Sequence, residues 1–356
     1  MVEMADIIRR HGPAYLKKYH HAILPSHRKA MQDIEQCRTP DLGGTTYLCK
    51  DCAKFDYSYH SCCNRACPKC GNNKTTEWIG KQEALLLPIP YFLVTFTVPA
   101  PARHPTRSHQ KTVYSILMST AWQALQKLAC DPRHLGARPG AVAVLQTWKR
   151  DMGYHPHVHF LVPAGGLATD RSRWIPARNS KYLVPEKPLA IIFKAKFRES
   201  ITQAGLSAIF PASTWAQGWV VDVEWVGSGH EAIKYLAPYM YRTAISNNRI
   251  VSLHEGDVTY RYKDNEDRWH EKTLSAECFL SRFLQHVLPK GFQRIRYYGF
   301  LHSSARESFN LIRSLLGQPI YQKPVPPAPP PPRPCPHCGG TLTFFERFGR
   351  GKRGPP

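Results

Sequence analysis

The sequence predicts an α+β protein, with a central antiparallel sheet and flanking helices preceded by a helical module that binds zinc. Three observations support this fold class. Residues 91–98, 141–148 and 157–162 are rich in β-branched and aromatic side chains, which is typical of buried strands. Residues 108–128 carry apolar side chains at helical spacing. Two Cys-x-x-Cys pairs lie within the first 70 residues, with the ligand spacing of a structural zinc site.

The other elements follow in order along the chain. Residues 7–36 show helical spacing, and a short helix over 75–86 leads into Pro88. A turn at residues 151–153 makes the strands over 141–148 and 157–162 an antiparallel hairpin. Beyond them we expect a strand at 219–226, a helix at 230–242, a hairpin of 249–253 and 258–263 around a turn at 255–257, and a helix at 275–286.

Composition divides the chain into four parts. We expect a helical and zinc-binding domain over residues 1–88, a larger domain over 89–316, a proline-rich linker over 317–334 and a basic tail over 335–356. The tail begins with Cys335-Pro-His-Cys338, a Cys-x-x-Cys pair without an obvious partner pair. This pair could bind zinc with an outside ligand or by pairing two chains, or it could belong to a disordered stub.

The charge of the chain points to a polyanionic partner. Lys and Arg total 48 and Asp and Glu total 26, so the net charge is 48 − 26 = +22. Counterion release would supply much of the affinity for nucleic acid. An anionic membrane is the weaker alternative, because no apolar run reaches about 18 residues, and the N-terminus lacks the apolar core of a secretion signal. We therefore expect a cytoplasmic protein with reduced cysteines.

Two Cys-x-x-Cys pairs predict a structural zinc site. Cys49 and Cys52 are separated from Cys67 and Cys70 by fourteen residues, so that two pairs could complete a four-thiolate tetrahedron. Such a metal would fold a segment that is too small to hold its own core. A second zinc site could form from neighbouring cysteines and a histidine, or these could be ordinary buried cysteines; the residues concerned are Cys37, Cys62 and Cys63, with His60 or His20.

Alternating histidines in Tyr-His-Pro-His-Val-His-Phe-Leu-Val (residues 154–162) predict a second metal site. Alternate side chains of a strand share a face, so His157 and His159 point the same way. Two imidazoles on a rigid strand are a pair of metal ligands, although a polar strand edge would look similar. If Lys149 lies opposite Pro156, Gln146 lies opposite His159 as a third ligand. Asp151 in the turn is the rival, and Gln146 could also simply face solvent.

The expected helix over 230–242 carries two tyrosines on one face. Tyr235 and Tyr239 are four residues apart, one turn from each other. Beside a metal, a tyrosine hydroxyl can attack a phosphodiester. Arg242 and Lys234 could neutralise the same phosphate. The alternative is an amphipathic core helix with tyrosine hydroxyls at its surface.

From about residue 6 to residue 301, the chain resembles the two-tyrosine HUH transposases of the insertion-sequence-91 family. The matching segments are CRTPDLGG, YLCKDC, SCCNRACPKC, VTFTVP, YHPHVHFLVPAGG, YLAPYMYRTAISNNRI and FLQHVLPKGFQRIRYYG. This chain departs from the family pattern at four positions. Gln146 stands where relatives often have His, Ala66 replaces a His before CPKC, and Pro238 and Tyr241 replace an Arg and a His.

The resemblance implies a fold, a set of site residues and a reaction. A five-stranded antiparallel sheet would carry His157 and His159 as ligands of Mg²⁺ or Mn²⁺ on a central strand. Tyr235 and Tyr239 would be nucleophiles on an adjacent helix. Residues 89–316 would then be the HUH tyrosine transposase domain, and residues 1–88 would bind DNA.

The implied reaction is the nicking and rejoining of single-stranded DNA at the ends of an insertion element, through a 5′-phosphotyrosine, in rolling-circle transposition. Rejoining needs no nucleotide cofactor, because the covalent link conserves the bond energy. The chain contains no GxxxxGK[ST] loop, so we expect host replication or helicase proteins to unwind DNA at the bacterial nucleoid. Two alternatives remain: a non-enzymatic zinc-finger DNA-binding protein, and a metal-dependent nuclease that uses water.

Overall fold

The computed structural model describes residues 2–70, 79–80, 82–178, 182–231, 233, 243–322 and 333–350. The chain forms two units. The first comprises Met1–Lys74, Arg242–Val287 and Val325–Pro356, and the second comprises Thr75–Tyr241 and Leu288–Pro324. Among the described residues, no helix is both long enough and apolar enough to cross a bilayer.

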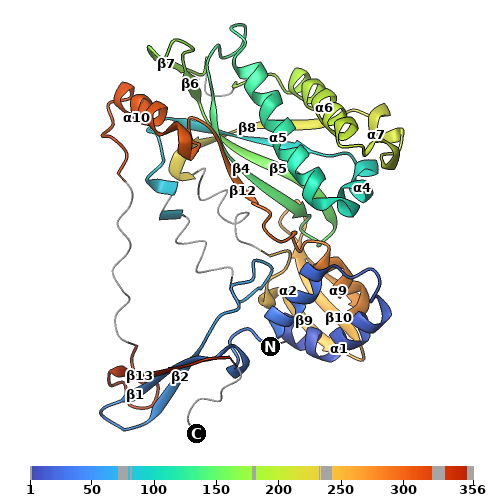
Figure 1. The fold of residues 1–356 in the computed structure, drawn as a ribbon, viewed down its shortest axis with the longest axis vertical. Coiled ribbons are helices and arrows are strands. Elements are labelled where there is room, and N and C mark those ends of the chain that lie inside the picture. The colour runs from blue at the N-terminus through green and yellow to red at the C-terminus, as the bar shows by residue number, and fades with distance from the viewer. Residues whose placement is uncertain are drawn as a thin grey trace. The chain divides into compact units, whose positions relative to one another are not determined.

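The second unit is built on a five-stranded sheet in the order β12-β4-β5-β3-β8, in which every neighbouring pair is antiparallel (Figure 1). The expected antiparallel sheet is therefore confirmed, and β5 is its central strand. The strands are β3 (Pro90–Thr97), β4 (Gly140–Trp148), β5 (Tyr154–Pro163), β8 (Val220–Ser228) and β12 (Ile295–Gly299). A small separate sheet pairs β6 (Gly165–Leu167) with β7 (Trp174–Pro176).

One face of this sheet holds the main core of the unit. Phe92, Val94 and Phe96 of β3 alternate with Leu93, so their side chains leave the sheet on the same side. They are fully buried in a cluster with Phe160 of β5. The helices that cover this face are α5 (Gln110–Ala129) and α6 (Glu186–Gln203), as Figure 1 shows. The other α-helices described in this unit are α4 (Arg103–Ser108), α7 (Ser213–Ala216) and α10 (Arg306–Leu315).

The opposite face of the sheet carries a smaller apolar cluster. Leu93, Val142, Val144 and Leu161 are buried there with Ile233. Directly paired residues of antiparallel strands share a face, and Val144 pairs with His159. This second face is therefore the face of the histidines, and we call it the histidine face.

The first unit has two small antiparallel sheets with helices. One sheet has the order β13-β1-β2 and the other the order β11-β10-β9. The elements are α1 (Met4–Lys18), α2 (Pro25–Glu35), β1 (Gly44–Cys49), β2 (Phe55–Tyr59), β9 (Ile250–His254), β10 (Asp257–Lys263), β11 (Trp269–Ser275), α9 (Ala276–Leu284) and β13 (Leu342–Phe348).

The division into units differs from the expected domains in two places. Residues 243–287, expected in the larger domain, belong with the N-terminal helices. Contacts within the first unit explain this: Lys18 Nζ lies 2.8 Å from a Glu277 carboxylate oxygen, and the Met4 amide donates to Asn247 Oδ1 at 3.1 Å. The expected C-terminal tail is also not separate, because β13 pairs with β1 along its whole length.

Candidate functional site

The two histidines of β5 lie side by side on the histidine face. The ring centroids of His157 and His159 are 4.7 Å apart, and each residue is only 8% exposed. Thr97 of β3 pairs with His157 and Thr95 pairs with His159. The alternating pattern thus places both imidazoles on one side of the central strand, as the sequence predicted.

Hydrogen bonds hold both rings through the same nitrogen. Nδ1 of His157 lies 2.7 Å from the carbonyl oxygen of His155, and Nδ1 of His159 lies 2.9 Å from the hydroxyl of Thr95. Since a carbonyl can only accept, His157 donates from Nδ1 and its Nε2 carries the lone pair. This arrangement is the usual one for histidines that ligate a metal.

Burial keeps both imidazoles neutral. It lowers the pKa of His157 to about 4 and places the pKa of His159 well below its ordinary value, with the charge of His157 adding to the effect on His159. Metal ions bind the neutral ring. The two side chains therefore have the form of a ligand pair near neutral pH.

Gln146 lies next to His157, which corrects the expected register. The expectation paired Gln146 with His159, but the structure pairs Gln146 with His157 and Val144 with His159. The cause is a tighter turn than expected: Trp148 pairs with Tyr154, and an irregularity between Gln146 and Trp148 then shifts the register by one residue. Gln146 still shares the histidine face, because directly paired residues point the same way.

The side-chain amide of Gln146 is oriented for an oxygen ligand. Its Nε2 donates to the carbonyl oxygen of Trp148 at 3.0 Å. Among the described residues, its buried Oε1 has no hydrogen-bond partner. A buried acceptor without a partner is costly, and a cation at this position would satisfy it. Amide oxygen is a donor that Mg²⁺ and Mn²⁺ accept.

Asp151, the rival third ligand, has a different role in the structure. It lies in the turn between β4 and β5, where its carboxylate accepts a hydrogen bond from the Gly153 amide at 3.0 Å. In the described part of the chain, only cysteine clusters bring three or more His, Cys, Asp or Glu ligand atoms within 4.8 Å of one another. The Asp151 carboxylate therefore does not lie within such a group with the two imidazoles in this structure.

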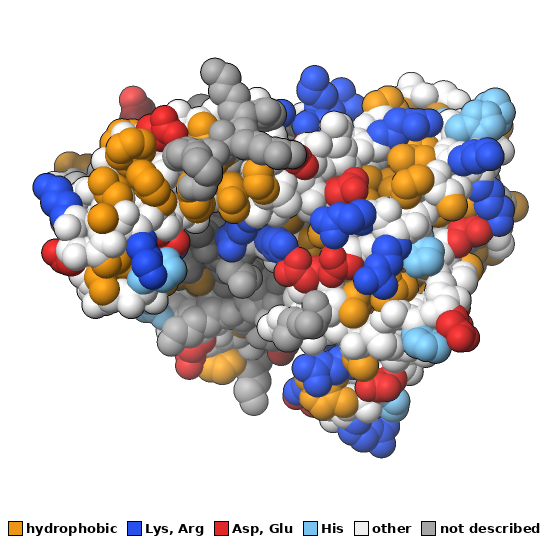
Figure 2. Space-filling model, turned by 90° about the horizontal axis from the view of Figure 1, so that it is seen from below, with side chains coloured by type: hydrophobic (Ala, Val, Ile, Leu, Met, Phe, Trp, Pro, Cys, Tyr) orange, Lys and Arg blue, Asp and Glu red, His pale blue; other side chains and the backbone are white. Residues whose placement is uncertain are grey.

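Basic side chains lie near the histidine pair, and sequence reasoning missed them. Burial lowers the pKa of His155 to about 4, and the charges of His157, Arg103 and Lys149 add to the effect. His155 belongs to strand β5. Elsewhere, Lys and Arg side chains are spread over the face shown in Figure 2, with acidic and apolar side chains between them.

The segment that carries the expected nucleophiles lies mostly outside the described residues. Tyr235, Tyr239, Lys234 and Arg242 belong to that part, as do Pro238 and Tyr241. Ile233, directly before them, is described and only 2% exposed, in the cluster on the histidine face. Ile233 thus lies on the face of the sheet that holds His157 and His159.

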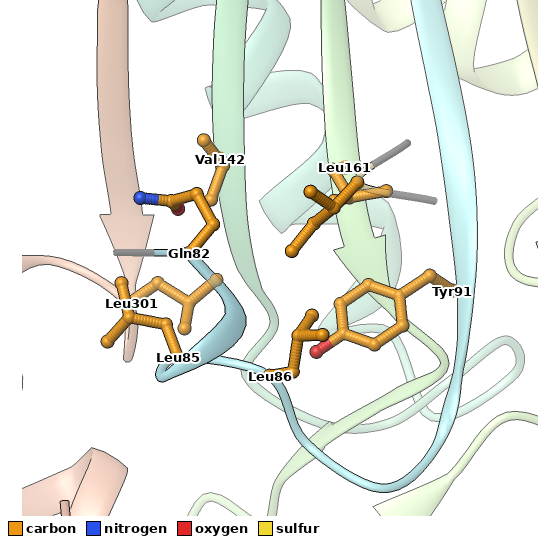
Figure 3. A pocket seen from close by; sticks show the side chains of 8 residues that line it. Gln82, Leu85, Leu86, Tyr91, Val142, Leu161 and Leu301 are labelled. Atoms are coloured by element: carbon orange, nitrogen blue, oxygen red, sulfur yellow. The ribbon is translucent and has the colours of Figure 1, made fainter. Parts of the chain in front are cut away.

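A small cavity lies beside Ile233 on the same face (Figure 3). Its volume is about 20 Å³, enough for one water molecule. It is lined almost entirely by apolar side chains: Gln82, Leu85, Leu86, Tyr91, Val142, Leu161, Ile233 and Leu301. Its size and lining indicate imperfect packing in this cluster, and it is too small to hold a nucleotide.

Eight cysteines of the first unit form two four-thiol clusters. The first consists of Cys37, Cys62, Cys67 and Cys70. The second consists of Cys49, Cys52, Cys335 and Cys338. Within each cluster, all four sulfur atoms lie within 4.8 Å of one another.

This grouping corrects the expected zinc site. Cys49 and Cys52 were expected to share one metal with Cys67 and Cys70, but the structure places the two pairs in different clusters. The reason is strand β2, whose five residues span about 17 Å in extended form. Cys52 precedes this strand and Cys62 follows it, so that they lie near opposite ends. Cys37 and Cys62, expected at a separate second site, instead complete the cluster of Cys67 and Cys70.

Two family models match the chain. One, described as "Transposase zinc-binding domain", matches residues 7–98, which include six of the eight clustered cysteines. The other, described as "Putative transposase", matches residues 140–308, which include β4 and β5 with the histidine pair. Both descriptions refer to one class of protein, the transposases.

Two relatives agree with this class. One relative is the "Putative transposase y4qJ" of Sinorhizobium fredii. It is 36% identical over 340 residues, which cover 89% of this chain and 85% of the relative. The "Transposase for insertion sequence element IS801" of Pseudomonas savastanoi pv. phaseolicola is 29% identical over 298 residues, 74% of this chain and 68% of the relative. The chain belongs to the insertion-sequence-91 family of transposases. No solved structure matches it.

Proposed function

We propose that this transposase nicks and rejoins single-stranded DNA at the ends of an insertion element through a 5′-phosphotyrosine, and so drives rolling-circle transposition. The observation that carries the proposal is the pair of buried, neutral imidazoles on the central strand of an antiparallel sheet. Their Nδ1 atoms are held by the His155 carbonyl and the Thr95 hydroxyl. This arrangement supports an HUH-type catalytic domain.

The donor set fits a divalent metal ion. His157 and His159 would each supply Nε2, and Gln146 would supply Oε1, which is buried and has no hydrogen-bond partner among the described residues. Two imidazoles and one oxygen suit Mg²⁺ or Mn²⁺ bound together with phosphate oxygens. When bound, such an ion withdraws charge from the scissile phosphate.

Tyr235 and Tyr239 are the proposed nucleophiles. A tyrosine oxygen forms a bond to phosphorus as its proton leaves, and the bond from phosphorus to the 3′-oxygen breaks to give a 3′-hydroxyl. The reverse attack by a 3′-hydroxyl releases the tyrosine, so no nucleotide cofactor is needed. Support comes from Ile233, which is buried on the histidine face two residues before Tyr235. Arg242 and Lys234 are proposed to bind phosphate.

A single-stranded DNA substrate also implies partner proteins. Duplex DNA must be opened before a single strand is cut, and we assign this step to host replication or helicase proteins at the bacterial nucleoid. The net charge of +22 supports binding of the DNA backbone.

A covalent-adduct assay tests the mechanism. The full chain is incubated with Mn²⁺ and a labelled single-stranded oligonucleotide that carries an element end, and is then denatured. We expect a labelled adduct that survives denaturation, and we expect Tyr235→Phe with Tyr239→Phe to abolish it while DNA binding persists. Tyr262→Phe, on strand β10 of the other unit, is the matched control and should keep the adduct.

The other outcomes separate the alternatives. Free cleavage products without an adduct would indicate a nuclease that uses water. Binding without cleavage would indicate a zinc-finger DNA-binding protein. An adduct that persists after both substitutions would show that other residues are the nucleophiles.

A further inference from the structure

We propose that Cys49, Cys52, Cys335 and Cys338 bind a structural zinc ion that fastens the C-terminal segment to the N-terminal module. This site is additional to a zinc ion at the cluster of Cys37, Cys62, Cys67 and Cys70. Neither family match reaches residues 335–338. We call the two sites the terminal cluster and the N-terminal cluster.

The sulfur geometry of the terminal cluster fits tetrahedral zinc. The Sγ atoms of Cys49 and Cys338 are 3.5 Å apart, and those of Cys52 and Cys335 are 3.7 Å apart. With a zinc–sulfur bond of about 2.3 Å, the edge of a regular tetrahedron is about 3.8 Å. A disulfide would require about 2.05 Å. Four thiols at these separations therefore match the spacing of a zinc site and exceed that of a disulfide.

Backbone pairing holds the two cysteine pairs together. Strands β1 and β13 are paired from Gly44 with Phe348 to Cys49 with Leu342. The Thr343 hydroxyl donates to the Leu48 carbonyl at 3.0 Å, next to Cys49. The ladder thus ends where the four thiols meet, so that the register of the strands positions the cluster.

The loop of Cys335 and Cys338 has the hydrogen bonds of a metal-binding turn. The His337 amide lies 3.5 Å from the sulfur of Cys335, and the Gly339 amide donates to the Cys335 carbonyl at 2.9 Å. Gly339 has a φ of +79°, a conformation that favours glycine. Gly340 packs so closely on the Asp51 side chain that a Cβ there would collide with it. The two loops are therefore in direct contact around the thiols.

The buried apolar packing around this cluster is small. The buried apolar group consists of Cys49, Cys335 and Leu342, with Tyr47 and Cys52 packed against it. A three-stranded sheet with so little core needs another source of stability. In sites of this kind, the free energy of zinc binding is also folding free energy.

Metal content tests the proposal. The full chain, purified with zinc and dialysed, is analysed for bound zinc by mass spectrometry, with and without prior chelation. Cys335→Ser with Cys338→Ser and, separately, Cys49→Ser with Cys52→Ser should each lower the zinc content by one equivalent. The variant with all four substitutions should also lose only one equivalent, since the four thiols share one ion. Cys67→Ser with Cys70→Ser should remove the other.

A different grouping of the cysteines would give a different zinc content. If Cys49 and Cys52 shared a zinc ion with Cys67 and Cys70, substitution of Cys335 and Cys338 would leave the zinc content unchanged. That result would overturn the proposal. Cys278→Ser is the matched control, because Cys278 is exposed and lies outside both clusters in the same unit.

Alkylation of the unmodified chain provides a test that needs no variant. Cys338 and Cys278 are both exposed, so both are accessible to the reagent if neither binds metal. We expect Cys338 and Cys335 to be protected in the zinc-loaded protein and to react after chelation, while Cys278 reacts in both states. Equal reactivity of Cys338 and Cys278 in the loaded protein would refute the terminal zinc site.

Discussion

The hydroxyl of Thr95 should control the metal affinity of the histidine pair. Thr95 lies directly opposite His159 in the sheet, and its Oγ1 is 2.9 Å from Nδ1 of that ring. When Nε2 of His159 binds a metal, Nδ1 carries the proton and donates it to this hydroxyl. Thr95→Val removes the acceptor but keeps the β-branched shape that the strand favours.

The magnitude follows from the burial of the ring. His159 is only 8% exposed, so Thr95→Val removes a hydrogen bond from a buried N–H. That costs about 1–3 kcal/mol, and each 1.4 kcal/mol corresponds to about a tenfold change in a dissociation constant. We therefore expect Thr95→Val to bind Mn²⁺ roughly 10- to 100-fold more weakly, as found for other groups that orient metal ligands.

Strand β3 offers a matched control. Thr97 is on the same strand and face, is likewise half-buried, and pairs with His157. The His157 ring is held through Nδ1 by the His155 carbonyl, so its orientation does not depend on Thr97. Thr97→Val should change Mn²⁺ affinity by less than about twofold.

The assay is calorimetric titration of Mn²⁺ into the zinc-loaded chain at pH 7, with circular dichroism to verify the fold. Unchanged affinity in Thr95→Val would refute the argument. An equal loss in both variants would also refute it, because it would indicate a general disturbance of β3.

Two further predictions concern Gln146 and Asp264. Gln146→Ala should weaken Mn²⁺ binding about tenfold by removing the proposed oxygen ligand. Gln146→Glu should keep Mn²⁺ binding, because it supplies an oxygen at the same position. In the same titration, unchanged binding by Gln146→Ala would show that the third ligand is another residue. His270 and then Arg268 hold the pKa of Asp264 at about 2, below its unfolded value of about 3.9. A lowered folded pKa stabilises the protein above pH 4, and this contribution is lost as the pH falls toward 2. The difference in urea midpoint between the wild type and Asp264→Asn should therefore shrink over that range, whereas a constant difference would contradict the assignment.

Much of the five-stranded sheet is predictable because its signals are local. Strands β3, β4 and β5 lie within three residues of their predicted bounds, since runs of β-branched and aromatic residues mark them. The alternation of His157 and His159 likewise determines their shared face. Helix α6 was not predicted, although Leu189, Phe193 and Phe197 recur at every fourth position and give a sufficient signal.

The strand register at Gln146, the role of Thr95 and the grouping of the cysteines depend on interactions between residues that are distant in the sequence. The register that brings Gln146 to His157 follows from an irregularity at Thr147, which no local pattern indicates. Thr95 acquires its role only through pairing with His159, 64 residues away. The grouping of cysteines could not be read from spacing, because the partners of Cys49 and Cys52 lie near the other end of the chain.

The pairing of β1 with β13 has a consequence for the timing of synthesis. Cys49, at the end of β1, and Cys338, just before β13, are 289 residues apart. At about 5–20 residues per second, a ribosome needs roughly 15–60 s to make that interval. During this time β2 covers one edge of β1, and the other edge has no native partner. Strand β1 is therefore completed only by a segment that is made much later, so a copy of the element truncated before β13 would encode a chain with an exposed strand edge.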